Sequence, residues 1–379
     1  MRVSKAISLA LVTLLIIPLI APAAAGEWTD DGWLTNLIGP ERMENGDEFG
    51  CHGFEGVDSM QDNWVIDECR EYLLDHTNAS RWGKAPVSFG FSESSLDNQT
   101  VSTLIESGFL IVGDMLEDTP VGLASFVRNG GSMEKNSANF QLLESAEEDT
   151  LVSVWWRARV DDIKVREDKD LISWLENQDV WFTTWGEWHL HGISGNSTNF
   201  SVDGSKVTID SPKAERWSVP GTTSLQFEGG ISAVHDSFGE IFPELSPDSR
   251  KLETGWRAIE GGILVTQSPG SSIILDLEEE PDSISLTPMS TFNDLHHGVT
   301  VVGHHTTNLF QWSSDFQKSI LTFTWLVERP SEETINWSLP IIAISVLIAV
   351  PIIVKKVVQM DDLNHSDLQN QELNNMDSD

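Results

Sequence analysis

Two near-continuous apolar stretches constrain this fold most, because a strand that is apolar on both faces must be covered on both faces. The stretches are FLIVGD at 109–114 and GVTVVG at 298–303. The apolar spacing predicts a helix at 96–108 that ends at a glycine, and a second helix at 119–131 that also ends at glycines. Strands that alternate with helices of this length indicate βαβ units, so we expect an α/β fold with a parallel sheet.

Other segments predict further elements. The apolar residues of 62–76 share one helical face, and a helix is also expected at 171–178. From about 140 to 220 the pattern changes to strands and long loops. Residues 26–60 show little periodicity and predict a loop-rich entry. We expect strands at 85–91, 150–160, 180–193, 224–234, 261–268 and 271–277, and a hairpin at 199–210 with its turn at Asp203-Gly204.

Three stretches together resemble a known family. FLIVGD followed by GLASFVRNGGSM (122–133), then ILVTQSPGSSIILDL (263–277) and finally the segment from 298 to 326 are similar to class I glutamine-amidotransferase-like domains. The similarity is to the non-catalytic branch in membrane-anchored prokaryotic proteins of the gliding-motility and ABC-transporter auxiliary type. It implies a Rossmann-like domain over 61–330 with a β-rich insertion at about 140–220. No cysteine stands on a nucleophile turn, so the amidotransferase reaction is not implied.

The segment 314–327 fits two structures. Phe316, Ile320, Phe323 and Val327 lie at helical spacing, whereas Leu321, Phe323, Trp325 and Val327 alternate as in a strand. Periodicity alone does not choose between them. The resemblance implies a closing helix here.

Both ends of the chain carry apolar runs. Residues 1–25 have a basic start, an apolar run and the small-residue site Ala23-Ala24-Ala25, which is the layout of a secretory signal peptide. Residues 337–354 span about 27 Å as a helix and are followed by Lys355-Lys356, so they predict one transmembrane helix with a cytoplasmic C-terminus. A stalk at 331–336 and an acidic tail at 355–379 complete the predicted organisation. The expected location is the cell membrane, with the large domain outside.

Charge and cysteine content agree with export. The chain has 59 Asp+Glu against 23 Lys+Arg, a net charge of −36, so nucleic acid is not an expected partner. Lipid around the membrane helix, and other membrane or surface proteins, are the expected partners. The two cysteines, Cys51 and Cys69, predict one disulfide. Five N-x-[ST] sequons are candidate glycosylation sites and indicate a glycosylating host: Asn78, Asn98, Asn196, Asn199 and Asn336.

Histidines are the candidate metal ligands. GEWHLHG at 186–192 and HHGVTVVGHH at 296–305 hold six of the chain's ten histidines. On a strand, Glu187, His189 and His191 share one face and suit zinc or another transition metal. The two ends of the second stretch lie about 20 Å apart if it is extended, so only one histidine pair can join the first cluster. His304 and His305 are favoured over His296 and His297, because they follow a predicted parallel strand at its carboxyl end.

Two functions therefore remain from sequence. The first is a membrane-anchored extracellular binding or scaffolding domain without catalytic activity and without a cofactor, such as an accessory subunit of a membrane complex. The second is a metal-dependent extracellular hydrolase that uses Glu187, His189, His191 and the His304–His305 pair. Alternatively, these histidines bind no metal and are ordinary polar surface residues at strand ends and in loops.

Overall fold

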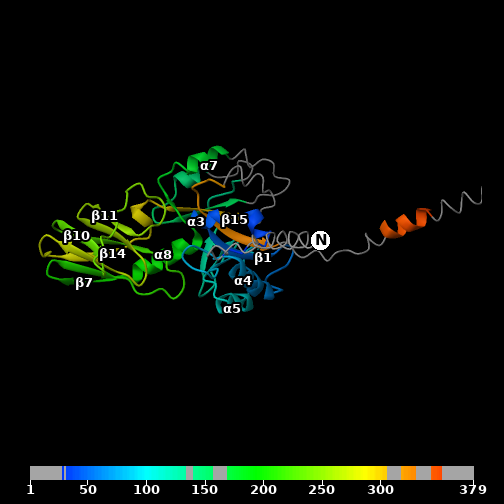
Figure 1. The fold of residues 1–379 in the computed structure, drawn as a ribbon, viewed down its shortest axis with the longest axis horizontal. Coiled ribbons are helices and arrows are strands. Elements are labelled where there is room, and N and C mark those ends of the chain that lie inside the picture. The colour runs from blue at the N-terminus through cyan, green and yellow to red at the C-terminus, as the bar shows by residue number, and fades with distance from the viewer. Residues whose placement is uncertain are drawn as a thin grey trace, which may run out of the picture. The chain divides into compact units, whose positions relative to one another are not determined.

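The computed structural model describes residues 28–29, 31–133, 140–156, 169–304, 317–329 and 343–351. The chain divides into two units, Met1–Arg329 and Pro330–Asp379. The first unit is mixed α/β with a parallel sheet, as the sequence predicts (Figure 1). The predicted signal peptide, stalk and acidic tail lie outside the described residues.

The parallel sheet has the strand order β4-β3-β2-β1-β16-β15-β5, and the short β6 also pairs with β15. Each of these pairings is parallel. From β1 to β4, each strand in chain order is added next to the previous one, towards one edge of the sheet. The next strand, β5, forms the opposite edge. The strands are β1 (Glu48–Phe54), β2 (Ser88–Phe91), β3 (Ile111–Asp114), β4 (Ala124–Val127), β5 (Leu151–Trp156), β6 (Trp181–Phe182), β15 (Gly298–His304) and β16 (Phe323–Arg329).

The two edges of this sheet are joined by the segment 129–133, which follows β4. Its backbone bonds to β5: Gly130 N donates to Ser153 O, and Trp155 N donates to Gly131 O. The Asn129 side chain adds two bonds to β5, one to Leu151 O and one from Ser153 N. Since β4 and β5 are the outermost strands, the sheet curls and has a concave face and a convex face.

Helices cover the convex face. The α4 helix (Trp64–His76) buries Val65, Ile66 and Leu73 against β1, while α5 (Asn98–Glu106) begins at Asp97, whose side chain accepts from Thr100 N. Both helices were predicted. The shorter helices of this unit are α2 (Leu34–Leu37), α3 (Glu41–Glu44), α6 (Phe140–Glu144) and α7 (Lys169–Leu175).

The N-terminus of α8 (Trp185–Ser197) fills the concave face near the amino ends of the strands. Trp185 N donates to Thr324 Oγ1 at 3.0 Å, and Trp185 Nε1 donates to Ser153 Oγ at 2.9 Å. Gly186 N donates to Glu48 Oε2 at 2.7 Å, so a fully buried carboxylate meets the positive end of the helix. The carboxyl ends of the strands remain for other side chains.

Two antiparallel sheets follow α8 and pack face to face. Their orders are β10-β13-β8-β7 and β11-β12-β9-β14, and their shared core includes Val207 and Ile273 from one sheet and Leu225 and Val265 from the other. Figure 1 places them at the end of this unit away from α4 and α5. The strands are β7 (Asn199–Asp203), β8 (Lys206–Asp210), β9 (Gly221–Phe227), β10 (Ile231–Asp236), β11 (Gly255–Ile259), β12 (Gly262–Gln267), β13 (Ser272–Leu277) and β14 (Ile284–Pro288).

The hairpin at 199–210 is confirmed, but the β-rich part spans 199–288 and not 140–220. The predicted range was wrong because 151–156 is a strand of the parallel sheet and 185–197 is a helix. The strand predicted at 180–193 is correct only for β6. Thr184 caps α8 by accepting from Glu187 N, which makes the Thr184-Trp-Gly-Glu187 stretch a capping-box sequence.

Three further predictions were wrong. The helix predicted at 119–131 is the strand β4, which begins after Gly122 adopts a positive φ of 91°. The closing segment is the strand β16 in its described part, and its alternation reflects pairing with β1 and β15 on either side. The entry predicted as loop-rich contains the central strand β1, whose sequence EFGCHGF is interrupted by two glycines, a residue type depleted in strands.

The second unit contributes one described helical segment, 343–351. It falls within the predicted membrane span 337–354, whose other residues are not among those described. Within the described parts of the chain, no helix is both long and apolar enough to cross a membrane.

The predicted disulfide is present and joins β1 to α4. Cys51 and Cys69 are 18 residues apart and both are buried. We expect the Cys51→Ala/Cys69→Ala variant to lose about 3 kcal/mol of unfolding free energy, because the cross-link restricts the unfolded chain. Urea unfolding of the two proteins measures this loss. Wild-type protein in reductant should approach the variant's midpoint, and equal midpoints in all three samples would contradict the expectation.

Candidate metal centre

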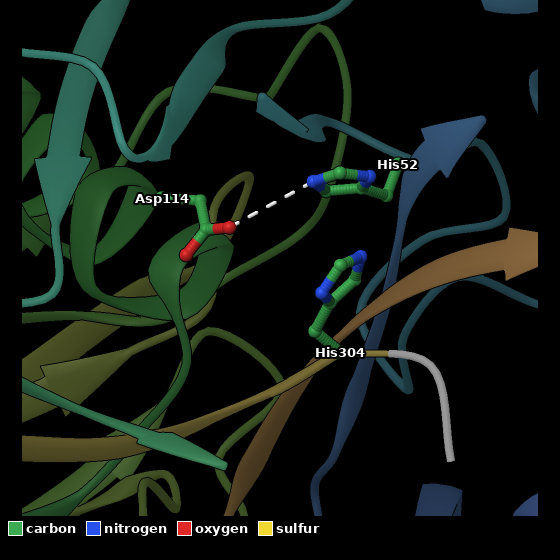
Figure 2. A group of neighbouring side chains, drawn as sticks. All are labelled: His52, Asp114 and His304. Atoms are coloured by element: carbon green, nitrogen blue, oxygen red, sulfur yellow. Dashed lines mark ion pairs between the residues drawn. The ribbon is translucent and has the colours of Figure 1, made fainter. Parts of the chain in front are cut away.

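A buried cluster of His52, Asp114 and His304 lies at the carboxyl edge of the parallel sheet (Figure 2). His52 lies near the end of β1, Asp114 is the last residue of β3, and His304 is the last residue of β15. One ligand-type atom of each lies within 4.8 Å of the others. In α/β sheets this edge is where ligands bind, above all where the strand order changes direction, as it does beside β1.

The cluster is held tightly. His52 Nε2 is 3.7 Å from Asp114 Oδ2, and the two imidazole rings have centroids 3.9 Å apart. The exposed fractions of His52, Asp114 and His304 are 8%, 2% and 5%. Gly90 on β2 provides the space, because a Cβ there would come within 2.9 Å of the His52 ring. Polar groups this buried normally have hydrogen-bond partners.

Asp114 has a backbone conformation that few residues adopt. Its φ is 76°, a left-handed value that costs a non-glycine residue roughly 1–2 kcal/mol, with aspartate among the more tolerant types. Strain of this kind persists where the surrounding structure enforces it, and it clusters at functional sites. The conformation turns the carboxylate towards the two histidines (Figure 2).

Arg128 stabilises the charged form of the Asp114 carboxylate. Its Nη2 donates to Asp114 Oδ2 at 2.9 Å, its Nε forms an ion pair with Asp114 Oδ1, and its guanidinium lies 4.1 Å from the centre of the Trp155 ring. Burial alone would raise the pKa of Asp114, but His52 and Arg128 favour the charged form and hold the pKa below its usual value. The cluster therefore contains a carboxylate that is ionised at neutral pH.

Glu328 contacts both histidines from β16. Its Oε2 is 3.2 Å from His304 Nε2, and its Oε1 is 3.9 Å from His52 Nδ1. His52 Nε2 and both ring nitrogens of His304 are buried and make no hydrogen bond to a described residue, although His304 Nε2 lies at ion-pair distance from Glu328. Burial, reinforced by the neighbouring His52, lowers the pKa of His304 to about 4, so its ring is neutral and offers a lone pair at pH 7.

The residue types fit a transition metal. Two imidazoles and one carboxylate are ligands of zinc and of non-haem iron, and three protein ligands leave a coordination position open for water or substrate. The ligand atoms already lie within 4.8 Å of one another. Small side-chain rotations would therefore place each of them ~2 Å from one shared ion, the metal–ligand distance that such ions require.

The predicted cluster of Glu187, His189 and His191 does not form, since these residues lie on a helix. Glu187 is buried and accepts from Trp82 Nε1 at 2.6 Å and from Arg81 Nη2 at 3.1 Å. His191 Nε2 contacts Thr222 Oγ1 at 2.9 Å, against the antiparallel part. His189 lies between them in sequence and points to another side, as helical spacing requires. Among the described residues, none of the three joins His304 in a ligand group.

The second predicted stretch separates as expected. His304 belongs to the cluster at one end of β15, while His296 and His297 precede the other end. Their Nδ1 atoms are 3.1 Å apart, and both rings line a cavity of about 260 Å³ beside α7. His305 lies outside the described residues, as does Asn336.

Sequence reasoning missed His52 and Asp114. The aspartate that ends FLIVGD was a usable signal, because a carboxylate directly after a buried parallel strand lies on the ligand-binding edge. His52 gave no comparable signal, since β1 was not recognised as a strand. Pairing the three residues also requires the position of β16 between β1 and β15.

No protein-family model, curated protein or solved structure matches this chain. The function is therefore argued from the cluster and from its place in the sheet. Three cavities of about 260, 300 and 310 Å³ lie among the described residues, and His52, Asp114 and His304 do not line any of these three.

His191 makes stability depend on pH. Burial lowers its pKa to about 3, from 6.5 when exposed. The unfolded chain therefore binds a proton that the folded chain does not, so stability falls as the pH drops from about 6.5 towards about 3, by up to ~1.4 kcal/mol per pH unit. Urea unfolding at a series of pH values should show a smaller slope for His191→Gln. Equal slopes for both proteins would show that His191 is not buried in its neutral form.

Proposed function

We propose that this protein is a metal-dependent hydrolase whose metal is bound by His52, Asp114 and His304. The observation that carries the proposal is the burial, within 4.8 Å of one another, of three ligand groups at the carboxyl edge of a parallel sheet. A purely structural cluster would satisfy its polar atoms internally, whereas His52 Nε2 and His304 Nδ1 lack hydrogen-bond partners among the described residues.

The proposed chemistry needs little beyond this set. A bound zinc-type ion acts as a Lewis acid and supplies hydroxide from water near neutral pH. His52 Nε2 and His304 Nδ1 would hold the ion, and Asp114 would balance its charge. Arg128 keeps Asp114 ionised and fixes its orientation through two contacts. Glu328 lies 3.2 Å from His304 Nε2 and 3.9 Å from His52 Nδ1, so its carboxyl group would orient the two rings from outside the ion's own ligands.

The proposal retains the metal-dependent hydrolase expected from the sequence but assigns the metal to different ligands, of which only His304 was predicted. A histidine-based metal hydrolase was one of the two predicted functions, with His304 among its ligands. The other function, a non-catalytic binding or scaffolding protein, is favoured by one observation, since the three cavities lie away from the cluster. The Rossmann-like, amidotransferase-like classification and the anchoring by residues 337–354 in the cell membrane are also proposals.

Metal content tests the proposal directly. Purified full-length protein should bind one transition-metal ion per chain, and His52→Ala/His304→Ala should bind none, because two of three ligands are removed. His189→Ala is the matched control, since it removes a histidine that the sequence favoured and the fold places elsewhere. Metal loss in the control, together with retention in the double variant, would refute the assignment.

Catalysis requires a second readout. Metal-loaded protein should hydrolyse an activated ester such as p-nitrophenyl acetate, and chelation should abolish this activity. Asp114→Asn should lose it as well, because asparagine tolerates the positive φ but carries no charge. Bound metal without metal-dependent hydrolysis of esters, amides or phosphate esters would favour the binding function.

Glu328 should tune metal affinity without binding the metal itself. We expect Glu328→Gln to weaken zinc binding about 10–100-fold, because the carboxylate that orients the two imidazoles is lost. Competition with a chromophoric chelator measures the affinity. The matched control is Glu68→Gln on α4, an exposed carboxylate remote from the cluster. Unchanged affinity in Glu328→Gln would remove Glu328 from the centre.

A further inference from the structure

A second candidate site lies at the opposite end of the parallel sheet from the metal cluster. A cavity of about 300 Å³ is formed between α8, Phe126 of β4, the chain just before β5, and the end of β14 with the chain that follows it. Its volume is at the lower limit for small-molecule sites, which suits one small ring. Its lining includes Phe126, Asp149, Trp188, His189, Asn196 and Ser290.

Aromatic side chains make two of its walls. Trp188 packs on the buried Trp181 with ring centroids 5.3 Å apart, and a Cβ on Gly298 would come within 2.8 Å of the Trp188 ring. The indole is therefore fixed in place before any ligand arrives. Phe126 lies edge-on to His189 at 6.4 Å. A flat aromatic face with a negative quadrupole attracts the C–H face of a sugar ring, which is apolar and slightly positive.

The polar groups suit neutral hydroxyls. Burial lowers the pKa of His189, so its ring is neutral at pH 7 and has one donor and one acceptor. Asn196 Nδ2 donates to Gly192 O at 2.8 Å, which leaves the amide oxygen as an acceptor. Ser290 and Asp149 add a hydroxyl and a carboxylate. No lysine or arginine lines the cavity, so an anionic ligand would find no countercharge.

We propose that this cavity binds a neutral sugar unit. Two sources share that chemistry: a separate glycan, or a glycan carried by the chain itself. The second arises because Asn196 lines the cavity and begins the sequon Asn196-Ser197-Thr198. This site is independent of the metal centre, so either proposal can fail alone.

Attachment at Asn196 is compatible with the local hydrogen bonding. A bond would form between Asn196 Nδ2 and C1 of the first sugar, with loss of one amide proton and of the lipid pyrophosphate that carried the sugar. The nitrogen keeps one proton, which is enough to retain the bond to Gly192 O. The first sugar would then be attached at the cavity that Trp188 also lines.

The first experiment uses full-length protein from a host without N-glycosylation. Glucose, galactose, mannose and N-acetylglucosamine are titrated, and binding is followed by saturation-transfer NMR. At least one sugar should bind with a Kd of about 1–10 mM, and Trp188→Ala should weaken it about tenfold or more. Trp64→Ala is the matched control, since this tryptophan is 55% exposed on α4 and does not line the cavity.

Protein from a glycosylating host distinguishes the sources. If the chain's own glycan fills the cavity, mass spectrometry should find Asn196 occupied. Free sugar should then not bind until Asn196→Gln is introduced, whereas Asn199→Gln should not restore binding. An unoccupied Asn196 with free-sugar binding assigns a separate glycan. The proposal is overturned if no sugar binds the unglycosylated protein at millimolar concentration, or if Trp188→Ala binds as well as the wild type.

Discussion

The curl of the parallel sheet determines what the rest of the first unit can do. It is fixed where the 129–133 segment bonds to β5 and joins the two outer strands. Curling leaves little space for side chains on the concave face. This explains the glycines at Gly50, Gly90 and Gly113, where a Cβ would meet neighbouring atoms at 2.7 Å or less. The same curl brings Arg128, from beyond β4, onto Trp155 of β5. Side chains from both edges thus meet above the carboxyl ends.

The two ends of the concave face have different occupants for an electrostatic reason. At the amino ends, the first N–H groups of α8 meet Glu48, and this carboxylate also accepts from Ser88 Oγ. Burial raises the pKa of Glu48, while these hydrogen bonds oppose the rise. The helix terminus therefore offsets part of the cost of burying this carboxyl group. At the carboxyl ends, Asp114 and Glu328 instead face histidines, and Arg128 pairs with Asp114.

How far the sequence could predict this arrangement depends on strand β16. FLIVGD and GVTVVG were recognisable because strands covered on both faces are apolar throughout. β1 was not recognisable from sequence, because EFGCHGF has glycine where the curled sheet leaves no room for a side chain. The alternation in 321–327 left helix and strand equal, and only the strand inserts between β1 and β15. His304 was therefore predicted at the ligand-binding edge, while its partners, His52 and Asp114, were not.

The buried nitrogens of the cluster are the strongest argument for a cation. Asp114 is held in its charged form by His52 and Arg128, inside a site where desolvation makes charge costly. Burial and the adjacent His52 lower the pKa of His304 to about 4, so protonation of this ring does not supply a further positive charge at neutral pH. A divalent cation between the two imidazoles and Asp114 would interact with that carboxylate, and it would give His52 Nε2 and His304 Nδ1 a partner in one step.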